Sequence, residues 1–399
     1  MAKKRGVGVL VLIMALSGCY LLGFQGKDRG DRIGGGARHG IERERFLRVP
    51  QIIWGLNNQK IALARAALTA RYLNRSLLMP TLSASLSHNS SSPAQTIPFD
   101  AVFSLDSFNS RCSGFVRIAR EADVPDGAPA VEVIKGSGRR WTAARDLEHL
   151  EECRRQDHEV LEILGKNPFL WPDHWAVREY VTIFQCLELT SSIISDVEYV
   201  ASRLELASSS RNPSYVAVHM RIERDWMIHC RNTEKRALEK EGKKLSICSS
   251  KEEIIDRVRR IESLKRPALV YLAVADVLLE EGESSLLRGW GEDLVPVEKK
   301  KLGVLDRYAR HPYLIQAAID YEICRRATVF VGNSFSTFSS LVVLQRTLDA
   351  PHSCESSFAY NLVTDKGSAR PWLADLSKAS LSEISYESLE VSCAVTPAP

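Results

Sequence analysis

Short apolar runs alternate with segments of helical periodicity along this chain, and no other feature restricts its fold as strongly. Residues 49–54 form an apolar run that ends before Gly55, and residues 76–80 form a second one. Between them, the alanine-rich residues 57–72 repeat apolar side chains at helical spacing, at Ile61, Ala64, Leu68 and Tyr72. A strand, a helix and a second strand in this order form the βαβ unit of a parallel sheet.

The same alternation returns in the second half of the chain. Residues 215–220 and 268–272 are apolar enough for buried strands, residues 314–326 have a helical period, and residues 328–331 fit the last strand. The sequence therefore predicts an α/β fold of two doubly wound, Rossmann-like domains that face each other across a cleft.

The segments between these units are expected to be helical. Residues 141–206 are mainly of helical type, and the charged residues 231–266 fit a solvated helical face. Asn212-Pro213 marks a boundary. We therefore expect three parts after the N-terminal region: a domain at 46–210, a domain at 211–365 and a C-terminal tail at 366–399.

Composition limits the function classes. A chain of 399 residues exceeds what one compact core usually carries, which agrees with two domains. Its 45% hydrophobic and 26% charged residues are typical of globular proteins and exclude wholesale disorder. The net charge of +4 gives no case for a nucleic-acid partner, although a local basic pocket for an anion is compatible with it.

The N-terminus carries a targeting signal. Three basic residues, Lys3, Lys4 and Arg5, precede an uncharged run at residues 6–24. At about 1.5 Å per residue, this run matches the hydrocarbon core of a bilayer. Basic charge before it and mixed charge after it favour a cytosolic N-terminus. We expect residues 1–24 to form a cytosolic tip and signal-anchor helix, residues 25–45 a stem, and the body to be lumenal.

Other interpretations of this leader stay open. A cleaved signal peptide would leave a soluble lumenal protein, and Leu16-Ser17-Gly18-Cys19 fits a bacterial lipoprotein cleavage site. Acceptor triplets for N-glycosylation at Asn74 and Asn89 agree with a lumenal body. Among nine cysteines, Cys230 and Cys248 are a plausible local disulfide, and the remaining connectivity cannot be read from the sequence.

Charged side chains follow the strand predicted at residues 215–220. His219, Arg221, Glu223 and Asp225 lie at its carboxyl end, where ligands bind in open α/β sheets. The planar guanidinium of Arg221 can hold a phosphate by two parallel hydrogen bonds. The alternative is a structural pair of Arg221 with an acidic neighbour that closes the strand end.

A second polar segment follows the strand at residues 328–331. Gly332 permits a tight turn, after which a helix is expected to start. Free amides and the helix dipole at such a start bind anions. A Ser or Thr N-cap with nothing bound explains the same pattern. The candidate binding residues are Gly332, Asn333, Ser336, Thr337 and Phe338.

The third segment is the loop after residues 49–54. The amides of Asn58 and Gln59 can reach a diphosphate or a sugar hydroxyl from there. Asn57 fits a helix cap better than Asn58 does.

Together the three segments resemble the GDP-fucose protein O-fucosyltransferase family. Its N-terminal motif is similar to Asn58-Gln59 with residues 73–80. Its second motif is similar to His219-Met220-Arg221 with Asp225-Trp226 and Cys230, and its third to Gly332-Asn333 with Ser336-Thr337-Phe338. The match runs from about Val49 to Leu341, with the middle matching only loosely.

The resemblance implies a GT-B-type fold and an inverting glycosyltransferase that uses GDP-fucose and needs no metal or other cofactor. It implies that Arg221 contacts the diphosphate and that Asn58 lies close to the reacting groups. It places His219 and Asp225 along the donor site, with Ser336, Thr337 and Phe338 on the nucleotide. We expect a glycoprotein acceptor. With the leader described above, we also expect a single-pass type II protein of the Golgi membrane, or alternatively residence in the lumen of the endoplasmic reticulum.

The chain departs from the family at two positions. Trp54 stands where the N-terminal motif usually has glycine. Thr328 stands where an acidic residue often occurs, a position that bears on recognition of guanine. Related plant-type families use UDP-rhamnose or polysaccharide acceptors, and a catalytically silent lumenal protein that binds a sugar nucleotide is a third hypothesis. For an enzyme, Glu223, Asp225 and His219 are the candidate general bases, and the leaving phosphate is a further proton acceptor.

Overall fold

The computed structural model describes residues 43–85, 95–134, 143–155, 157–164, 174–208, 214–242, 245–274, 283–351 and 354–384. The predicted anchor, the stem up to residue 42, the Asn89 triplet and the Asn212-Pro213 boundary lie outside these ranges. Within them, no helix is long and apolar enough to cross a membrane.

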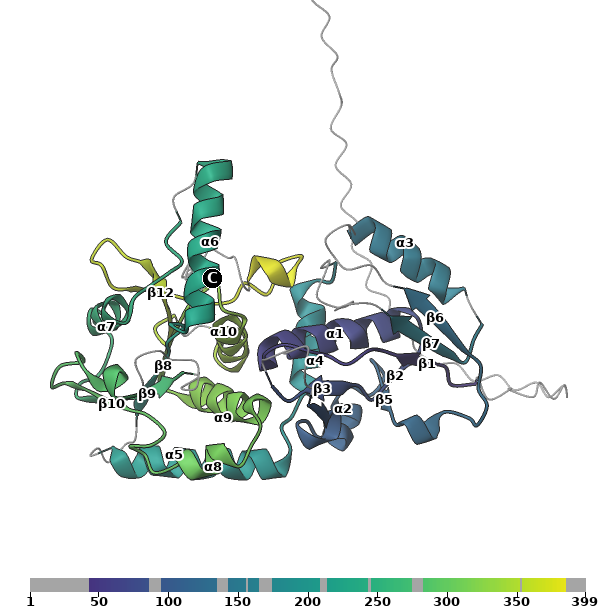
Figure 1. Ribbon diagram of the computed structural model, residues 1–399, viewed down its shortest axis with the longest axis horizontal. Coiled ribbons are helices and arrows are strands. Elements are labelled where there is room, and N and C mark those ends of the chain that lie inside the picture. Colours follow the sequence, from purple (N-terminus) through teal and green to yellow (C-terminus); the bar gives the residue numbers. More distant parts are fainter. Residues whose placement is uncertain are drawn as a thin grey trace, which may run out of the picture. The chain divides into compact units, whose positions relative to one another are not determined.

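The first half of the chain builds a five-stranded parallel sheet in the order β5-β2-β1-β7-β6 (Figure 1). Its strands are β1 (Phe46–Arg48), β2 (Ser76–Leu78), β5 (Ile118–Ala119), β6 (Ala130–Ile134) and β7 (Val160–Leu164). A separate antiparallel pair joins β3 (Thr81–Ser83) to β4 (Thr96–Pro98). The parallel pairing of β1 with β2 confirms the predicted βαβ unit.

One strand prediction in this half is wrong. The first strand ends at Arg48, before the apolar run at 49–54, of which Ile52 forms only an isolated bridge to Leu82. Pro50 lacks the N–H that a ladder needs, which explains why the strand stops ahead of it. The middle region is mainly helical, as expected, but it also contains β7, an unpredicted strand that lies between β1 and β6 in the sheet.

Helix α1 (Leu56–Tyr72) is the predicted first helix and is buried on almost every side. Alanines contribute the best helix propensity and allow close packing. α1 contacts α4, α9 and α10. A helix enclosed in this way also has to bury polar side chains, among them Gln59, Lys60, Arg65 and Thr69.

The second half builds a six-stranded sheet in the order β10-β9-β8-β11-β12-β13 (Figure 1). All neighbours are parallel except β12 and β13. The strands are β8 (Tyr215–His219), β9 (Ala268–Ala273), β10 (Leu294–Val297), β11 (Val329–Gly332), β12 (Ser357–Val363) and β13 (Ala369–Pro371). The predictions for β8, β9 and β11 are confirmed.

The expectation that residues 328–331 form the last strand is wrong, because β12 and β13 follow. The segment assigned to a C-terminal tail contains β13 and Trp372, which is only 2% exposed. The amide of Trp372 donates to the carbonyl of Ser357, so this segment continues the sheet.

The remaining helices are α2 (Leu105–Arg111), α3 (Ala143–Arg154), α4 (Val177–Cys186), α5 (Ser191–Ala207), α6 (Arg224–Glu241), α7 (Lys251–Arg259), α8 (Leu305–Ala309), α9 (Tyr313–Arg326) and α10 (Thr337–Asp349). One apolar core runs through α1, α4, α5, α9 and α10. Helices from both sequence halves therefore share buried surface. The domain limits at residues 46–210 and 211–365, and the cleft between the domains, stay predictions.

Candidate active site

Arg221 lies two residues beyond the end of β8, between two carboxylates. Its Nη1 is 3.1 Å from Oε2 of Glu223, and its Nη2 is 3.6 Å from Oδ2 of Asp225. Glu223 is 2% exposed, whereas the side chain of Asp225 is 62% exposed. Burial opposes the positive charge of Arg221, but the two carboxylates outweigh it and raise its pKa. The guanidinium is thus oriented, charged and still partly open to solvent.

Three aromatic residues lie around Arg221, and among them the sequence pointed only to Trp226, as part of the second motif. The backbone N–H of Arg221 donates to the hydroxyl of Tyr360, on β12, at 3.1 Å. The ring of Trp226 lies 5.5 Å from the guanidinium. Burial, the largest cause, raises the pKa of Tyr313 to about 12, and the charges of Arg221 and Glu223 also act on this group. Tyr313 opens a helix that was predicted, whereas Tyr360 lies in a strand that was not, so no sequence signal pointed to it.

His219, the last residue of β8, is buried against α10. Its Nδ1 is 2.8 Å from Oγ of Ser339, and its ring stacks on Phe338 with centroids 4.4 Å apart. Burial lowers the pKa of His219 to about 3, and Arg221 lowers it further in the same direction. His219 is therefore neutral at physiological pH. A base this weak is poorly suited to accept a proton, which argues against the general-base role considered for it.

The start of α10 provides backbone amides for an anion. Ser336 is its N-cap, and the hydroxyl of Ser336 makes no capping hydrogen bond. Thr337 and Phe338 begin the helix, where the first amides have no intrahelical acceptor. Such a terminus favours a phosphate through its amides and its dipole.

Gly332 and Asn333 shape the turn into α10. The expected tight turn follows Gly332, since the amide of Ser336 donates to the carbonyl of Asn333. A Cβ on Gly332 would lie 2.6 Å from Cβ of Ser339, so close packing rather than an unusual φ requires glycine here. Asn333 is fully buried, with Nδ2 donating to the carbonyl of Ile247 at 3.2 Å and Oδ1 accepting from the amide of Phe335 at 3.0 Å. Its side chain thus builds the turn from within the protein.

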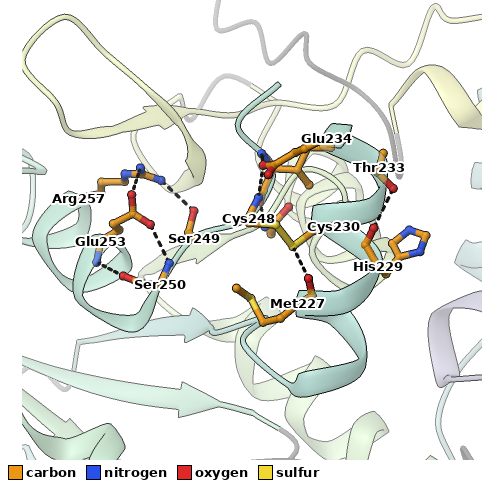
Figure 2. Close-up of a disulfide and its surroundings, with 12 residues drawn as sticks. Met227, His229, Cys230, Thr233, Glu234, Cys248, Ser249, Ser250, Glu253 and Arg257 are labelled. Atoms are coloured by element: carbon orange, nitrogen blue, oxygen red, sulfur yellow. Dashed lines mark hydrogen bonds and ion pairs between the residues drawn. A yellow bond between two sulfur atoms is a disulfide. The ribbon is translucent and has the colours of Figure 1, made fainter. Parts of the chain in front are cut away.

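The disulfide between Cys230 and Cys248, which the sequence predicted, supports this turn (Figure 2). It ties α6 to the segment that contains Ile247. The carboxylate of Glu234 accepts from the amides of Ile247 at 2.6 Å and Cys248 at 2.9 Å. α6 therefore holds the carbonyl on which the side chain of Asn333 depends.

The two predicted amides, Asn58 and Gln59, lie in the first turn of α1 rather than in a loop, and they differ in their surroundings. Gln59 is 2% exposed, and its amide exchanges hydrogen bonds with the backbone of Ser83 and donates to the carbonyl of Trp54. Asn58 is half-buried, and its amide makes no hydrogen bond within the described ranges. The N-cap of α1 is Gly55, so the expectation that Asn57 caps the helix is wrong.

Trp54 adopts φ of 86°, in the left-handed region that favours glycine. This is the position at which the sequence departs from the glycine of the resembled motif. The hydrogen bond from Gln59 to its carbonyl helps to hold this conformation.

The structure thus brings the predicted residues together in three groups. The first group consists of Arg221, Glu223 and Asp225. The second consists of His219, Phe338 and the Gly332-Asn333 turn, because His219 and the amide of Asn333 both bind the hydroxyl of Ser339. Asn58 and Gln59 belong to α1, which contacts α10. In the described part of the chain, no cluster of three or more His, Cys, Asp or Glu side chains is arranged to hold a metal ion.

Comparison with known proteins agrees with this geometry. The profile of a family described as "GDP-fucose protein O-fucosyltransferase" matches residues 46–349. The chain is also 52% identical over 386 residues to O-fucosyltransferase 23 of Arabidopsis thaliana, a match that covers 89% of this chain and 85% of that protein. The chain belongs to the GDP-fucose protein O-fucosyltransferase family. It is a glycosyltransferase.

More distant relatives share parts of the chain or its fold. O-fucosyltransferase 11 of Arabidopsis thaliana is 27% identical over 185 residues, which cover 43% of this chain and 29% of that protein. Crystal structures of POFUT1 with GDP and with GDP-fucose superpose with TM-scores of 0.54 and 0.51, both at 17% identity. The first match covers 78% of this chain and 97% of POFUT1, and it shows a shared α/β fold.

Proposed function

We propose that this enzyme transfers fucose from GDP-fucose to a hydroxyl of a protein acceptor, with inversion at the anomeric carbon. The observation that carries the proposal is the guanidinium of Arg221, held between Glu223 and Asp225 at the end of β8. Family membership and the complexes of POFUT1 with GDP and GDP-fucose support the choice of donor.

In the proposed reaction, the acceptor oxygen bonds to C1 of fucose while the bond from C1 to the β-phosphate oxygen breaks. GDP leaves with the bonding electrons and carries more negative charge than it did as an ester. Arg221 and the amides at the start of α10 stabilise that charge without reorganising. Ser336, Thr337 and Phe338 hold the nucleotide, and Asn58 supplies an uncommitted amide near the sugar.

The hydroxyl proton passes to a carboxylate or to the leaving phosphate. Glu223 is buried and directed to Arg221, whereas Asp225 is exposed and can be reached by an acceptor. We therefore assign Asp225 the role of base and Glu223 that of positioning Arg221. Asp225→Asn should lower kcat while leaving GDP affinity within a few-fold.

We place this reaction in the secretory pathway. Disulfides between Cys112 and Cys186 and between Cys230 and Cys248 fit an oxidising lumen. Residues 6–24 would anchor the enzyme in the Golgi membrane as a type II protein. Protease protection of tagged full-length protein in sealed microsomes tests the topology, and digestion of a C-terminal tag without detergent would refute it.

A donor panel tests the function. Purified enzyme is given GDP-fucose, other GDP-sugars and UDP-rhamnose, with a mixture of secreted glycoproteins, and free GDP and UDP are measured. We expect GDP release from GDP-fucose alone and fucose on protein. UDP release from UDP-rhamnose would make it a rhamnosyltransferase, and fucose on polysaccharide instead of protein would refute the acceptor class. Calorimetric binding of GDP-fucose without turnover would identify a silent binding protein.

A further inference from the structure

Lys60, in the second turn of α1, is a buried ammonium that no carboxylate neutralises. It is 9% exposed, and it makes no hydrogen bond or ion pair with any residue in the described ranges. Its Nζ lies 4.0 Å from the ring centroid of Tyr321, on α9, and 5.6 Å from that of Phe184, at the end of α4. A buried ammonium normally pairs with an acid. Here aromatic faces take that place, by cation–π attraction.

The ring under Lys60 is the first of three aromatic rings that lead to the proposed donor site. Tyr321 meets Phe338 edge to face, with centroids 5.8 Å apart. Phe338 stacks on His219, at 4.4 Å. The hydroxyl of Tyr321 donates to the carbonyl of Leu341 in α10, which fixes this ring against the same helix. A displacement of Tyr321 would therefore be passed to Phe338 and His219.

The charged residues around Lys60 explain why its ammonium contacts aromatic rings and not a carboxylate. Lys60 lines a cavity of about 840 Å³. The other charged groups that line the cavity form ion pairs with one another. Arg111, at the end of α2, pairs with Glu188, and Arg326 pairs with Glu322. Arg325, on α9, pairs with Glu322 and with Asp349 of α10. Burial lowers the pKa of Lys60 to about 8, with Glu322 raising it and Arg325 lowering it. Burial raises the pKa of Tyr321, so its ring stays neutral.

We propose that Lys60 is a positioning residue whose protonated ammonium holds α1, and with it Asn58, in register with the aromatic stack Tyr321–Phe338–His219. Deprotonation removes the cation–π attraction and frees α1 to shift relative to α10. The kinetic consequence rests on the proposed fucosyl transfer, whereas the structural consequence does not. Lys60 contacts no donor atom in this account, so its state should change kcat more than GDP affinity.

The direction in which the free energy of unfolding changes with pH distinguishes this effect from unfolding. An unfolded Lys60 keeps its proton up to about pH 10.5, whereas the folded one loses it near pH 8. Between these values the unfolded chain holds more protons at this site, so its contribution to the free energy of unfolding rises with pH. A loss of activity through pH 8 caused by Lys60 would therefore not be accompanied by a loss of stability from this group.

The kinetic test compares full-length wild type with Lys60→Arg and Lys60→Met from pH 6.5 to 9.5, with GDP-fucose as donor. We expect wild-type kcat to fall about tenfold with an apparent pKa near 8. The free energy that corresponds to this tenfold fall is smaller than that of a whole buried cation–π interaction. Lys60→Arg should keep its activity through pH 9.5, and Lys60→Met should be about tenfold lower at every pH. The exposed Lys366→Met is the matched control and should follow wild type.

A second readout does not need turnover. The ring ¹⁵N signals of His219 are followed by NMR from pH 7 to 9, a range in which His219 itself does not titrate. They should move with a midpoint near 8 in wild type and stay constant in Lys60→Met and Lys60→Arg. Constant His219 signals in wild type, or Lys60→Met with wild-type kcat and the same alkaline limb, would overturn the coupling. Wild type without GDP release from GDP-fucose would instead refute the proposed function, and the NMR titration would still decide the coupling.

Discussion

At the ends of β8 and β11, the side chains of His219, Arg221 and Asn333 already have protein partners, whereas at the start of α1 one amide is held and its neighbour is not. Arg221 lies between two carboxylates, and both the nitrogen and the oxygen of the Asn333 side-chain amide form hydrogen bonds within the protein. On α1, Gln59 is bound to backbone, but Asn58 has no hydrogen bond to a described residue. The site residues of the C-terminal half are thus preorganised, whereas in the N-terminal half the amide of Asn58 is available to bind the substrate.

This difference leads us to expect that changes in the C-terminal half weaken nucleotide binding, and that changes in the N-terminal half affect either stability or turnover. Preorganised groups bind without reorganisation, so removing a support releases several contacts at once. An amide without hydrogen bonds inside the protein supports no other contact. Its removal therefore affects only its interaction with the substrate.

The disulfides Cys112–Cys186 and Cys230–Cys248, whose cysteines all lie in the described ranges, should show the largest effect on stability. Cys112–Cys186 closes a sequence separation of 74 residues and Cys230–Cys248 one of 18. Replacing each pair by serine should lower the free energy of unfolding by about 4 and about 3 kcal/mol, respectively, because the longer loop restricts the unfolded chain more. Chemical denaturation measures both values.

Only the second pair should also affect GDP binding, because α6 and its disulfide hold the carbonyl that Asn333 needs. Calorimetry with GDP measures this difference. If the Cys230→Ser, Cys248→Ser protein bound GDP as tightly as wild type, the support that we assign to this disulfide would be disproved.

Neighbouring amides on α1 should separate stability from turnover. Gln59→Ala removes the hydrogen bonds of a buried amide to the backbone of Ser83 and Trp54 and should destabilise the fold by about 1–3 kcal/mol. Asn58→Ala should leave the free energy of unfolding within about 0.5 kcal/mol of wild type and lower kcat. Denaturation and initial rates measure the two quantities. A stable Gln59→Ala protein, or an unstable Asn58→Ala protein, would reverse the assignment.

The buried His219 should give a smaller, pH-dependent effect. Its pKa is about 3 in the folded protein and 6.5 in the unfolded chain. The unfolded chain therefore takes up this proton first as pH falls, and stability drops by about 1.4 kcal/mol per unit between these values. In His219→Asn, the slope of unfolding free energy against pH should decrease by that amount.

The sequence predicted the parts of the fold whose local signals agree with their surroundings. α1, β8, β9, β11 and α9 combine clear periodicity with burial. It failed where tertiary pairing decides: β7 is a short apolar run that becomes a strand only between β1 and β6, and Pro50 ended β1 earlier than the apolar pattern indicated.

The candidate site divides in the same way. Arg221, His219 and the start of α10 were predictable because they follow strands. The partners of Arg221 and His219 were not, because Tyr360 and Ser339 come from distant segments that only the fold brings close. Sequence position also could not reveal that Gln59 and Asn333 serve the protein backbone and that Asn58 does not.

The central claim is that the C-terminal half binds the nucleotide and that Asn58 acts on the transferred sugar. Titration calorimetry of GDP into wild type, Arg221→Ala, Asn58→Ala and the exposed control Arg236→Ala tests it most directly. We expect Arg221→Ala to weaken GDP binding by about 100-fold, as loss of a charged contact implies, and the other two proteins to match wild type, although Asn58→Ala no longer transfers fucose efficiently. Equal GDP affinity in wild type and Arg221→Ala would contradict the account.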